Sequence, residues 1–241
     1  MKSLRPKPAW NLSLICLLLA GGGLPTAMAG APAPIEIGLA VRDITPEPPI
    51  WLAGYAARKR PADRVDHPLV AQALAIKNFT GERFVLVSLD NCEVSQAFNA
   101  PVFAELQSKH GLKPGEVMIV SSHTHSAPVL ELTLEGMYGM SPADREKVRQ
   151  YSQTLRSKLV EVVGAALADT QPARLDQGRG RATFAMNRRV YRGDRIDFGE
   201  NLDGPVDWDV PVLRIRGTND TLRAIVFGYA CHGTSIHGDD F

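Results

Sequence analysis

Histidines occur at two places where an apolar run gives way to small polar residues. The run 117–120 precedes a His-x-His pair, His123 and His125, and the run 224–230 precedes His232. Short apolar runs of this kind are typical of buried strands, and side chains two apart on an extended strand project to the same side. Because neutral imidazole is a common ligand of zinc and similar metals, this spacing predicts a metal site where the two strands end.

A simpler interpretation of the histidines accompanies this prediction. A single histidine after a strand is usually a surface or turn residue, and only the recurrence of the pattern favours a metal site. Asp90, which follows the apolar run 83–89, has two possible roles. It can hold a ligating histidine in one tautomer, or it can cap a turn through its carboxylate.

The strands and helices expected to position these residues do not alternate regularly along the chain. The expected strands are 35–44, 69–78, 83–89, 117–120, 210–216 and 221–230. The expected helices are 99–110, which ends at Gly111, and 141–169, which begins with a Ser-Pro pair and a capping-box pattern. Apolar residues at spacings of three and four predict that one face of the second helix packs on a sheet. Hairpins combined with a crossover helix favour an α/β or α+β domain, with mixed β-sheets flanked by α-helices.

The remaining stretches predict less regular structure. A long loop is expected over 51–67 and an irregular apolar stretch over 128–140. The Arg-rich passage 174–181 predicts an exposed edge strand, because charges protect such edges, and 191–203 predicts a polar loop. A TIM-barrel amidohydrolase also places His-x-His after a strand, but that fold needs regular alternation of strands and helices.

Length and composition limit the class of protein. The 241 residues, 44% hydrophobic and 22% charged, suit one sizeable globular domain. The formal net charge of +1 and the lack of a basic stripe give no case for nucleic-acid binding. Nothing in the pattern indicates an oligomeric state.

The first 29 residues resemble a secretory signal peptide. A basic start precedes the apolar run 12–24, which is too short for a membrane span, and Ala27-Met28-Ala29 forms a small-x-small cleavage site. We therefore expect cleavage after Ala29, a mature domain over 30–241, and a periplasmic or secreted location. Export leaves Cys92 and Cys231, which we interpret as packed free thiols although the compartment permits a disulfide.

Three motifs in order carry a family resemblance: 122–126 (Ser-His-Thr-His-Ser), 187–189 (Asn-Arg-Arg) and 229–235 (Tyr-Ala-Cys-His-Gly-Thr-Ser). With the opening at 38–45 and Gly54-Tyr55, this sequence resembles the neutral/alkaline non-lysosomal ceramidase family. The resemblance implies a zinc-dependent amidase that hydrolyses the bond between a fatty acyl group and a sphingoid base. Its expected partner is thus a ceramide-like lipid, with peripheral contact to a membrane.

The resemblance also implies roles for four residues. His123 and His232 correspond to zinc ligands, and His125 and Arg188 correspond to residues that face the substrate. A bound zinc would activate water and polarise the scissile carbonyl. His125 would then act as acid/base or steady the oxyanion, and Arg188 would orient a polar group of the substrate.

The family pattern extends beyond this sequence. Its further ligands, a Glu and a Tyr, and its Ser motif correspond to positions after Phe241, and 126–128 reads Ser-Ala-Pro where Ser-Gly-Pro is usual. We therefore interpret the chain as an N-terminal part of a ceramidase-like zinc hydrolase domain. The alternative is a catalytically inactive exported domain that binds lipid or protein.

Overall fold

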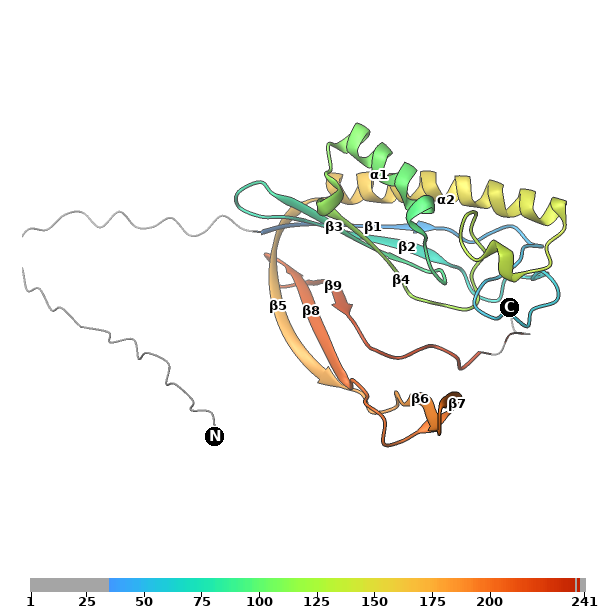
Figure 1. Ribbon diagram of the computed structural model, residues 1–241. Helices are drawn as coiled ribbons and strands as arrows, with labels where there is room; N and C mark the ends of the chain where they lie inside the picture. Colours follow the sequence, from blue (N-terminus) through green and yellow to red (C-terminus); the bar gives the residue numbers. More distant parts are fainter. Residues whose placement is uncertain (1–34, 237, 239–241) are drawn as a thin grey trace, which may run out of the picture. The chain divides into compact units, whose positions relative to one another are not determined.

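The computed structural model describes residues 35–236 and residue 238, which belong to one compact unit (Figure 1). The expected signal peptide, residues 1–29, lies outside these described residues. None of the helices described here combines the length and apolarity needed to cross a membrane.

A seven-stranded sheet organises the unit, in the order β4-β3-β2-β1-β5-β8-β9. Neighbouring strands are antiparallel except β3 and β4, which are parallel. The strands of this sheet are β1 (Ile35–Asp43), β2 (Val70–Lys77), β3 (Arg83–Leu89), β4 (Val117–Ser121), β5 (Gln171–Arg181), β8 (Asp209–Gly217) and β9 (Leu222–Phe227). The expected mixed sheet and its hairpins are confirmed, and the antiparallel pairing rules out the TIM-barrel alternative.

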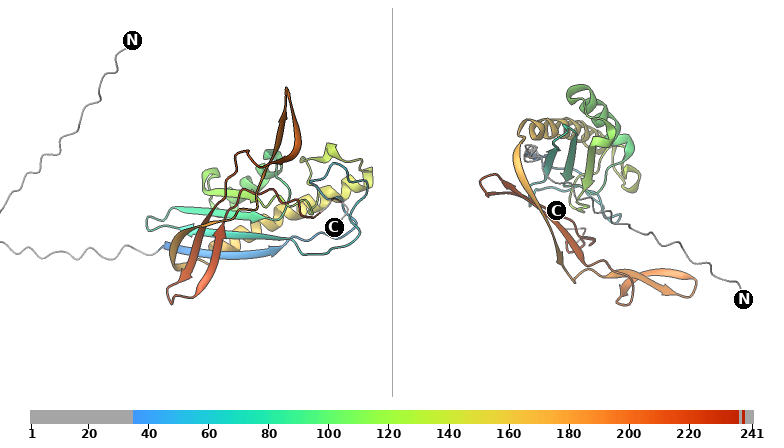
Figure 2. Two further views of the ribbon diagram at one scale, coloured as in Figure 1. Left: turned by 90° about the horizontal axis from the view of Figure 1, so that it is seen from below. Right: turned by 90° about the vertical axis from the view of Figure 1, so that its left-hand side faces the viewer.

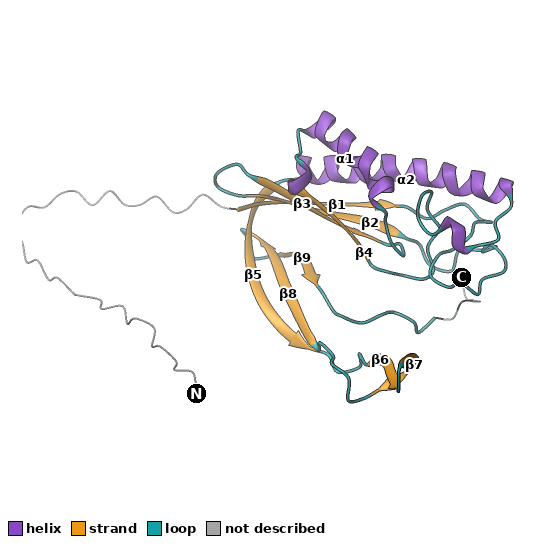
Figure 3. Ribbon diagram, in the orientation of Figure 1, coloured by secondary structure: helices purple, strands orange, loops and turns teal. Residues whose placement is uncertain are grey.

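Two helices, α1 (Gln96–His110) and α2 (Pro142–Ala168), lie on the same side of strands β1–β4 (Figures 1 and 3). The expected capping box is present, because Ser141 Oγ accepts a hydrogen bond from Asp144 N and Asp144 accepts one from Ser141 N. Gly111 ends α1 in the left-handed conformation, as the sequence predicts. Single 3₁₀ turns occur at η1 (Pro114–Glu116) and η2 (Glu135–Met137).

The main core lies between these helices and the sheet. The apolar face of α2 expected from the sequence is buried at Val148, Leu155, Leu159, Val162 and Ala166. Strand β1 approaches α2 so closely that a Cβ at Gly38 would lie 1.8 Å from the backbone oxygen of Ala166. The missing side chain at Gly38 therefore permits this layer spacing.

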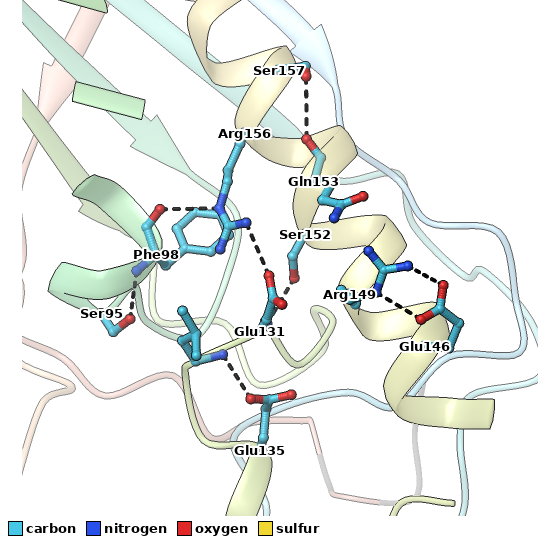
Figure 4. A network of polar contacts seen from close by, with 11 residues as sticks. Ser95, Phe98, Glu131, Glu135, Glu146, Arg149, Ser152, Gln153, Arg156 and Ser157 are labelled. Carbon is cyan, nitrogen blue, oxygen red and sulfur yellow. Dashed lines mark hydrogen bonds and ion pairs between the residues drawn. The ribbon is translucent and has the colours of Figure 1, made fainter. Parts of the chain in front are cut away.

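A polar network fastens the irregular stretch 128–140 to both helices (Figure 4). Arg156 on α2 donates to the carbonyl of Phe98 on α1 and to the carboxylate of Glu131, at 3.3 and 3.1 Å. Ser152 Oγ accepts a hydrogen bond from the Glu131 backbone at 2.8 Å. The segment that follows the His-x-His pair is therefore held in place by α2.

The second half of the sheet bends away from the first (Figure 2). Strand β5 pairs with β1 only over Gln171–Ala173, and its later residues pair with β8 alone. An open groove of about 800 Å³ lies between the two halves. Its lining includes Leu86, Val120, Leu213, Val226 and Phe227.

Several expectations for single elements were wrong. Passage 174–181 belongs to β5, an interior strand, and the supposed loop 191–203 contains most of a hairpin of β6 (Asn187–Arg192) and β7 (Arg195–Asn201). Strand β4 is a sheet edge with Met118 51% exposed, so the run 117–120 is not a fully buried strand. Composition misled the sequence argument: β5 and the β6–β7 hairpin carry polar side chains on faces open to solvent, whereas β4 keeps apolar side chains at a sheet edge.

Candidate metal centre

His123 and His125 lie in the segment just after β4, in irregular backbone. His123 has φ 58°, in the left-handed region, so the pair is not extended and strand alternation does not explain its geometry. The two rings meet edge-on, with planes at 77° and centroids 5.0 Å apart. The expected convergence of the two rings therefore occurs for a different reason, a backbone turn at His123.

His232 reaches the same place from the other half of the sheet. It lies in a segment without regular structure that begins after β9 ends at Phe227. The Nε2 atom of His232 lies 3.0 Å from that of His123 and 3.1 Å from that of His125. The Nε2 atoms of His123 and His125 lie 3.4 Å apart. Three imidazole nitrogens from two distant segments thus face one point.

Hydrogen bonds on both sides of His232 hold its segment. The hydroxyl of Tyr229 donates to the Ala182 carbonyl at 2.8 Å and accepts from the Ala185 backbone at 3.0 Å. At the other end, the hydroxyl of Tyr55 donates to the carbonyl of Ile236. These contacts explain how a loop residue is directed at the His-x-His pair.

The three nitrogens have a spacing that suits one metal ion. Two nitrogens bonded to a tetrahedral zinc at about 2.0–2.1 Å stand about 3.3 Å apart. The separations of 3.0 to 3.4 Å agree with this value. Three neutral imidazoles also form a common donor set for zinc, so the side chains present fit the ion.

A backbone carbonyl fixes the tautomer of His123. Its Nδ1 lies 2.7 Å from the carbonyl oxygen of Cys92, which can only accept, so Nδ1 carries the proton and Nε2 keeps its lone pair. Asp90, the residue considered for this role, instead accepts from the backbone of Val70 and caps the strand end. Sequence reasoning had no signal for the Cys92 carbonyl, because every residue carries one.

Arg188 contacts the other ring nitrogen of His232, Nδ1. A guanidinium group only donates, so Nδ1 accepts and the proton of a neutral ring lies on Nε2, facing His123. Binding a metal through His232 Nε2 therefore requires Arg188 to leave Nδ1. Arg188 was expected to face the substrate. The structure places it in contact with His232, a predicted metal ligand.

The thiol of Cys92 lies near the histidines, 3.9 Å from His123 Nδ1, and its sulfur lies within 4.8 Å of a ring nitrogen of both His123 and His125. Burial, with a smaller contribution from the charge of Glu93, raises the pKa of this thiol to about 11. Its hydrogen-bond contact is with Nδ1 of His123, the nitrogen that donates to the Cys92 carbonyl, and not with Nε2. We therefore assign the donor set to the histidines rather than to Cys92. Both cysteines are free thiols, as expected, but only Cys92 is packed; the expectation was wrong for Cys231, which is exposed in the segment after β9.

Two of the three imidazoles favour the neutral form. Burial, and then the charges of His232, His123, Arg188 and Arg58, lower the pKa of His125 below its ordinary 6.5. Burial and then Arg188 lower that of His232. Neutral rings keep a nitrogen lone pair near pH 7, as metal binding requires.

The fold and the three-imidazole cluster define a mixed-sheet domain with a candidate hydrolytic metal site, and comparison with known proteins names its family. Residues 35–240 match the N-terminal part of the neutral/alkaline non-lysosomal ceramidases. The chain belongs to this family, and the resemblance seen in its motifs is confirmed. Membership supports a hydrolase of the ceramidase type.

Individual relatives and solved structures that this chain matches are also ceramidases. Neutral ceramidases A and B of Dictyostelium discoideum are 26% and 27% identical over 209 residues, which are 84% of this chain and 29% of each relative. The crystal structure of neutral ceramidase from Pseudomonas aeruginosa matches with TM-score 0.65 and 25% identity, over 85% of this chain and 33% of that one. A ceramidase complexed with C2 matches with TM-score 0.63 over 83% and 31%. This chain thus spans about a third of the length of the proteins it matches.

Proposed function

We propose that this chain is the N-terminal part of a zinc-dependent amidohydrolase that cleaves the N-acyl amide bond of ceramide or a related lipid. The observation that carries the proposal is the approach of three imidazole Nε2 atoms to within 3.0 to 3.4 Å. Family membership supports the hydrolase class. A lipid amide is the substrate class that the names of its relatives suggest.

Each side chain has a proposed task. His123 and His232 hold the metal, which when bound supplies an acidified water and polarises the scissile carbonyl. His125 adds the third nitrogen of the cluster; its lowered pKa keeps the ring neutral near pH 7, so Nε2 can accept a proton when it is not bound to the metal. Arg188, beside His232, lies where a guanidinium can orient a carbonyl or hydroxyl oxygen of the substrate.

Metal content tests the ligand set. The purified chain is dialysed against zinc and its bound metal is measured by mass spectrometry, for wild type, His123→Ala and His232→Ala. We expect near-stoichiometric zinc in wild type and a loss of about a hundredfold or more in affinity in either variant. His110→Ala, at the end of α1, is the control and should bind zinc as wild type does.

Hydrolysis of a fluorescent ceramide tests the activity. A longer form that includes the sequence encoded after Phe241 should release fatty acid, and both ligand variants should lose that activity. Unchanged zinc content and unchanged amide hydrolysis in His123→Ala and His232→Ala would show that the proposal is wrong.

A second candidate function is a catalytically inactive exported domain that binds lipid or protein. Large apolar side chains that remain exposed favour it, among them Tyr191, Phe198 and Phe227 at 72%, 77% and 68% exposed. Such a domain would fold and bind lipid vesicles without zinc. Sedimentation with ceramide-containing vesicles, combined with a zinc measurement on the same protein, separates the two functions, because a binding domain would bind the vesicles and hold no zinc, whereas the hydrolase would hold the metal.

We further propose that the chain is exported and cleaved after Ala29, which places it in the periplasm or outside the cell. The basic start, apolar run and Ala-Met-Ala site support this location. Intact mass of the protein recovered from the exported fraction should begin at Gly30, and a retained Met1 would contradict the proposal.

A further inference from the structure

The three histidines differ in what holds their rings. Nδ1 of His123 donates to the Cys92 carbonyl, and Nδ1 of His232 contacts Arg188. Nδ1 of His125 is buried and has no hydrogen-bond partner among residues 35–236 and 238. The orientation of the His125 ring must therefore come from packing rather than from a bond to its second nitrogen.

Gly54, in the loop that follows β1, makes room for that ring. Its φ of +101° is a conformation that side chains disfavour. A Cβ on Gly54 would lie 2.4 Å from Cγ and 2.7 Å from Cδ2 of His125, closer than atoms can pack. The backbone of Gly54 thus forms one wall of the space that holds the imidazole.

Tyr55 and Arg58 complete the enclosure. The Tyr55 ring meets the His125 ring edge-on, with planes at 86° and centroids 4.7 Å apart. Arg58, only 5% exposed, donates through Nη2 to the backbone carbonyl of His125 at 2.7 Å. Its guanidinium carbon lies 5.6 Å from the Tyr55 ring centre, so the three residues form one packed unit.

We propose that Gly54 and Arg58 are positioning residues for His125, one acting on its ring and the other on its backbone. By fixing His125, they set the distance of its Nε2 atom from those of His123 and His232, and hence the metal affinity of the cluster. This inference rests on the proposed function for the metal itself, while the positioning of the ring can be measured without metal.

Gly54→Ala tests the wall, with Gly81→Ala as a matched control. Both glycines have positive φ, +101° and +87°, but no atom of the described residues lies within 4 Å of a Cβ at Gly81. Both variants therefore carry backbone strain, and only Gly54→Ala meets the imidazole. We expect affinity for Co²⁺, followed by its visible absorption, to fall about tenfold or more in Gly54→Ala and less than about twofold in Gly81→Ala.

Arg58→Met tests the backbone contact, with Arg156→Met as its control. Arg156 also donates to a backbone carbonyl and also lies over an aromatic ring, Phe98, at 4.8 Å (Figure 4). Both variants should lower the melting temperature, but only Arg58→Met should weaken Co²⁺ binding and change its absorption spectrum. Arg58→Lys, which keeps a cationic donor, should restore part of the affinity.

A metal-free measurement separates this inference from the proposed function. The ring signals of His125, observed by NMR in ¹⁵N-histidine-labelled protein with a chelator, should shift in Gly54→Ala and Arg58→Met and not in the two controls. If the His125 signals shift in this way while wild-type protein binds no metal, Gly54 and Arg58 position His125 and the proposed function is wrong. Unchanged His125 ring signals in both variants would overturn the inference, as would unchanged Co²⁺ affinity in a wild type that binds the ion.

Discussion

Each imidazole of the cluster is held by a chemically different neighbour. A backbone carbonyl fixes His123, a guanidinium contacts His232, and the packed loop around Gly54 encloses His125. These neighbours affect metal binding in opposite directions. The carbonyl leaves the His123 lone pair free on Nε2, whereas Arg188 competes for His232 by placing its proton there.

Replacing Arg188 tests this competition. In Arg188→Met the hydrogen bond to His232 Nδ1 is lost, so the ring can present Nε2 without first breaking a charged contact. We expect zinc affinity to rise by up to about tenfold while amide hydrolysis falls, because the proposed substrate contact is also lost. Competition with a fluorescent chelator measures the affinity.

The adjacent Arg189 provides the control for that variant. Its guanidinium also lies over the Phe198 ring, at 4.5 Å against 5.6 Å for Arg188. Arg189→Met should change zinc affinity by less than about twofold, as expected for an exposed charge. Weaker zinc binding in Arg188→Met would mean that Arg188 supports the site rather than competing for it.

The pH dependence of stability follows from the lowered pKa values of His125 and His232. Both rings have an ordinary value of 6.5 in the unfolded chain and a lower one in the fold. As pH falls through about 6.5 the unfolded state takes up protons that the native state does not, so this part of the stability is lost. The urea midpoint of metal-free protein should therefore decrease between about pH 7.5 and 5.5.

The variant His125→Asn isolates one part of that decrease. Removing the ring should make the change in urea midpoint with pH smaller than in wild type. An equal decrease in the two proteins would contradict the role assigned to His125.

At the scale of elements, the close approach of β1 to α2 leaves no room for a side chain at Gly38. A Cβ there would lie 1.8 Å from Ala166 O, so Gly38→Ala must displace the helix or the strand. We expect a loss of about 3 kcal/mol or more in the free energy of unfolding, at the upper end for overpacking. Urea unfolding followed by circular dichroism measures it.

Gly178 on β5 is the matched strand position, because within the described part of the chain no atom lies within 4 Å of a Cβ there. Gly178→Ala should leave the free energy of unfolding within about 1 kcal/mol of wild type. Similar losses in Gly38→Ala and Gly178→Ala would show that β1 and α2 are not in close contact in solution.

For the molecule as a whole, the apolar surface on the inner side of the bent sheet is the most unusual property. Edge strand β9 carries Ile225 and Phe227, each more than half exposed, and both residues line an open groove against strands β1, β2 and β3. Monomeric proteins seldom leave such a continuous surface open. The chain alone should therefore bind a hydrophobic dye such as ANS.

Phe227→Ser should reduce that dye binding by about half or more, because it removes the largest apolar group of the β9 edge. Phe79→Ser is the control, since Phe79 lies in the turn between β2 and β3 and is equally exposed, 67% against 68%. Equal effects of the two substitutions on ANS fluorescence would mean that the groove is closed in solution.

Local patterns in the sequence predicted much of the fold. The period of α2, its Ser141 cap, the glycine end of α1 and the hairpins depend on residues a few positions apart, and all are present. The candidate ligands could be chosen too, because imidazole is recognisable by type and the motifs have a family order.

Only the tertiary structure decided how those ligands are held. The Nε2 contact of His123 and His232 joins residues 109 positions apart, and it depends on the bend between β1 and β5. Residue type alone does not predict the Cys92 carbonyl contact, the turn at His123 or the packing of the His125 ring against Gly54. Sequence determines which groups are available for chemistry, whereas their separation and protonation are set by long-range packing that no local pattern encodes.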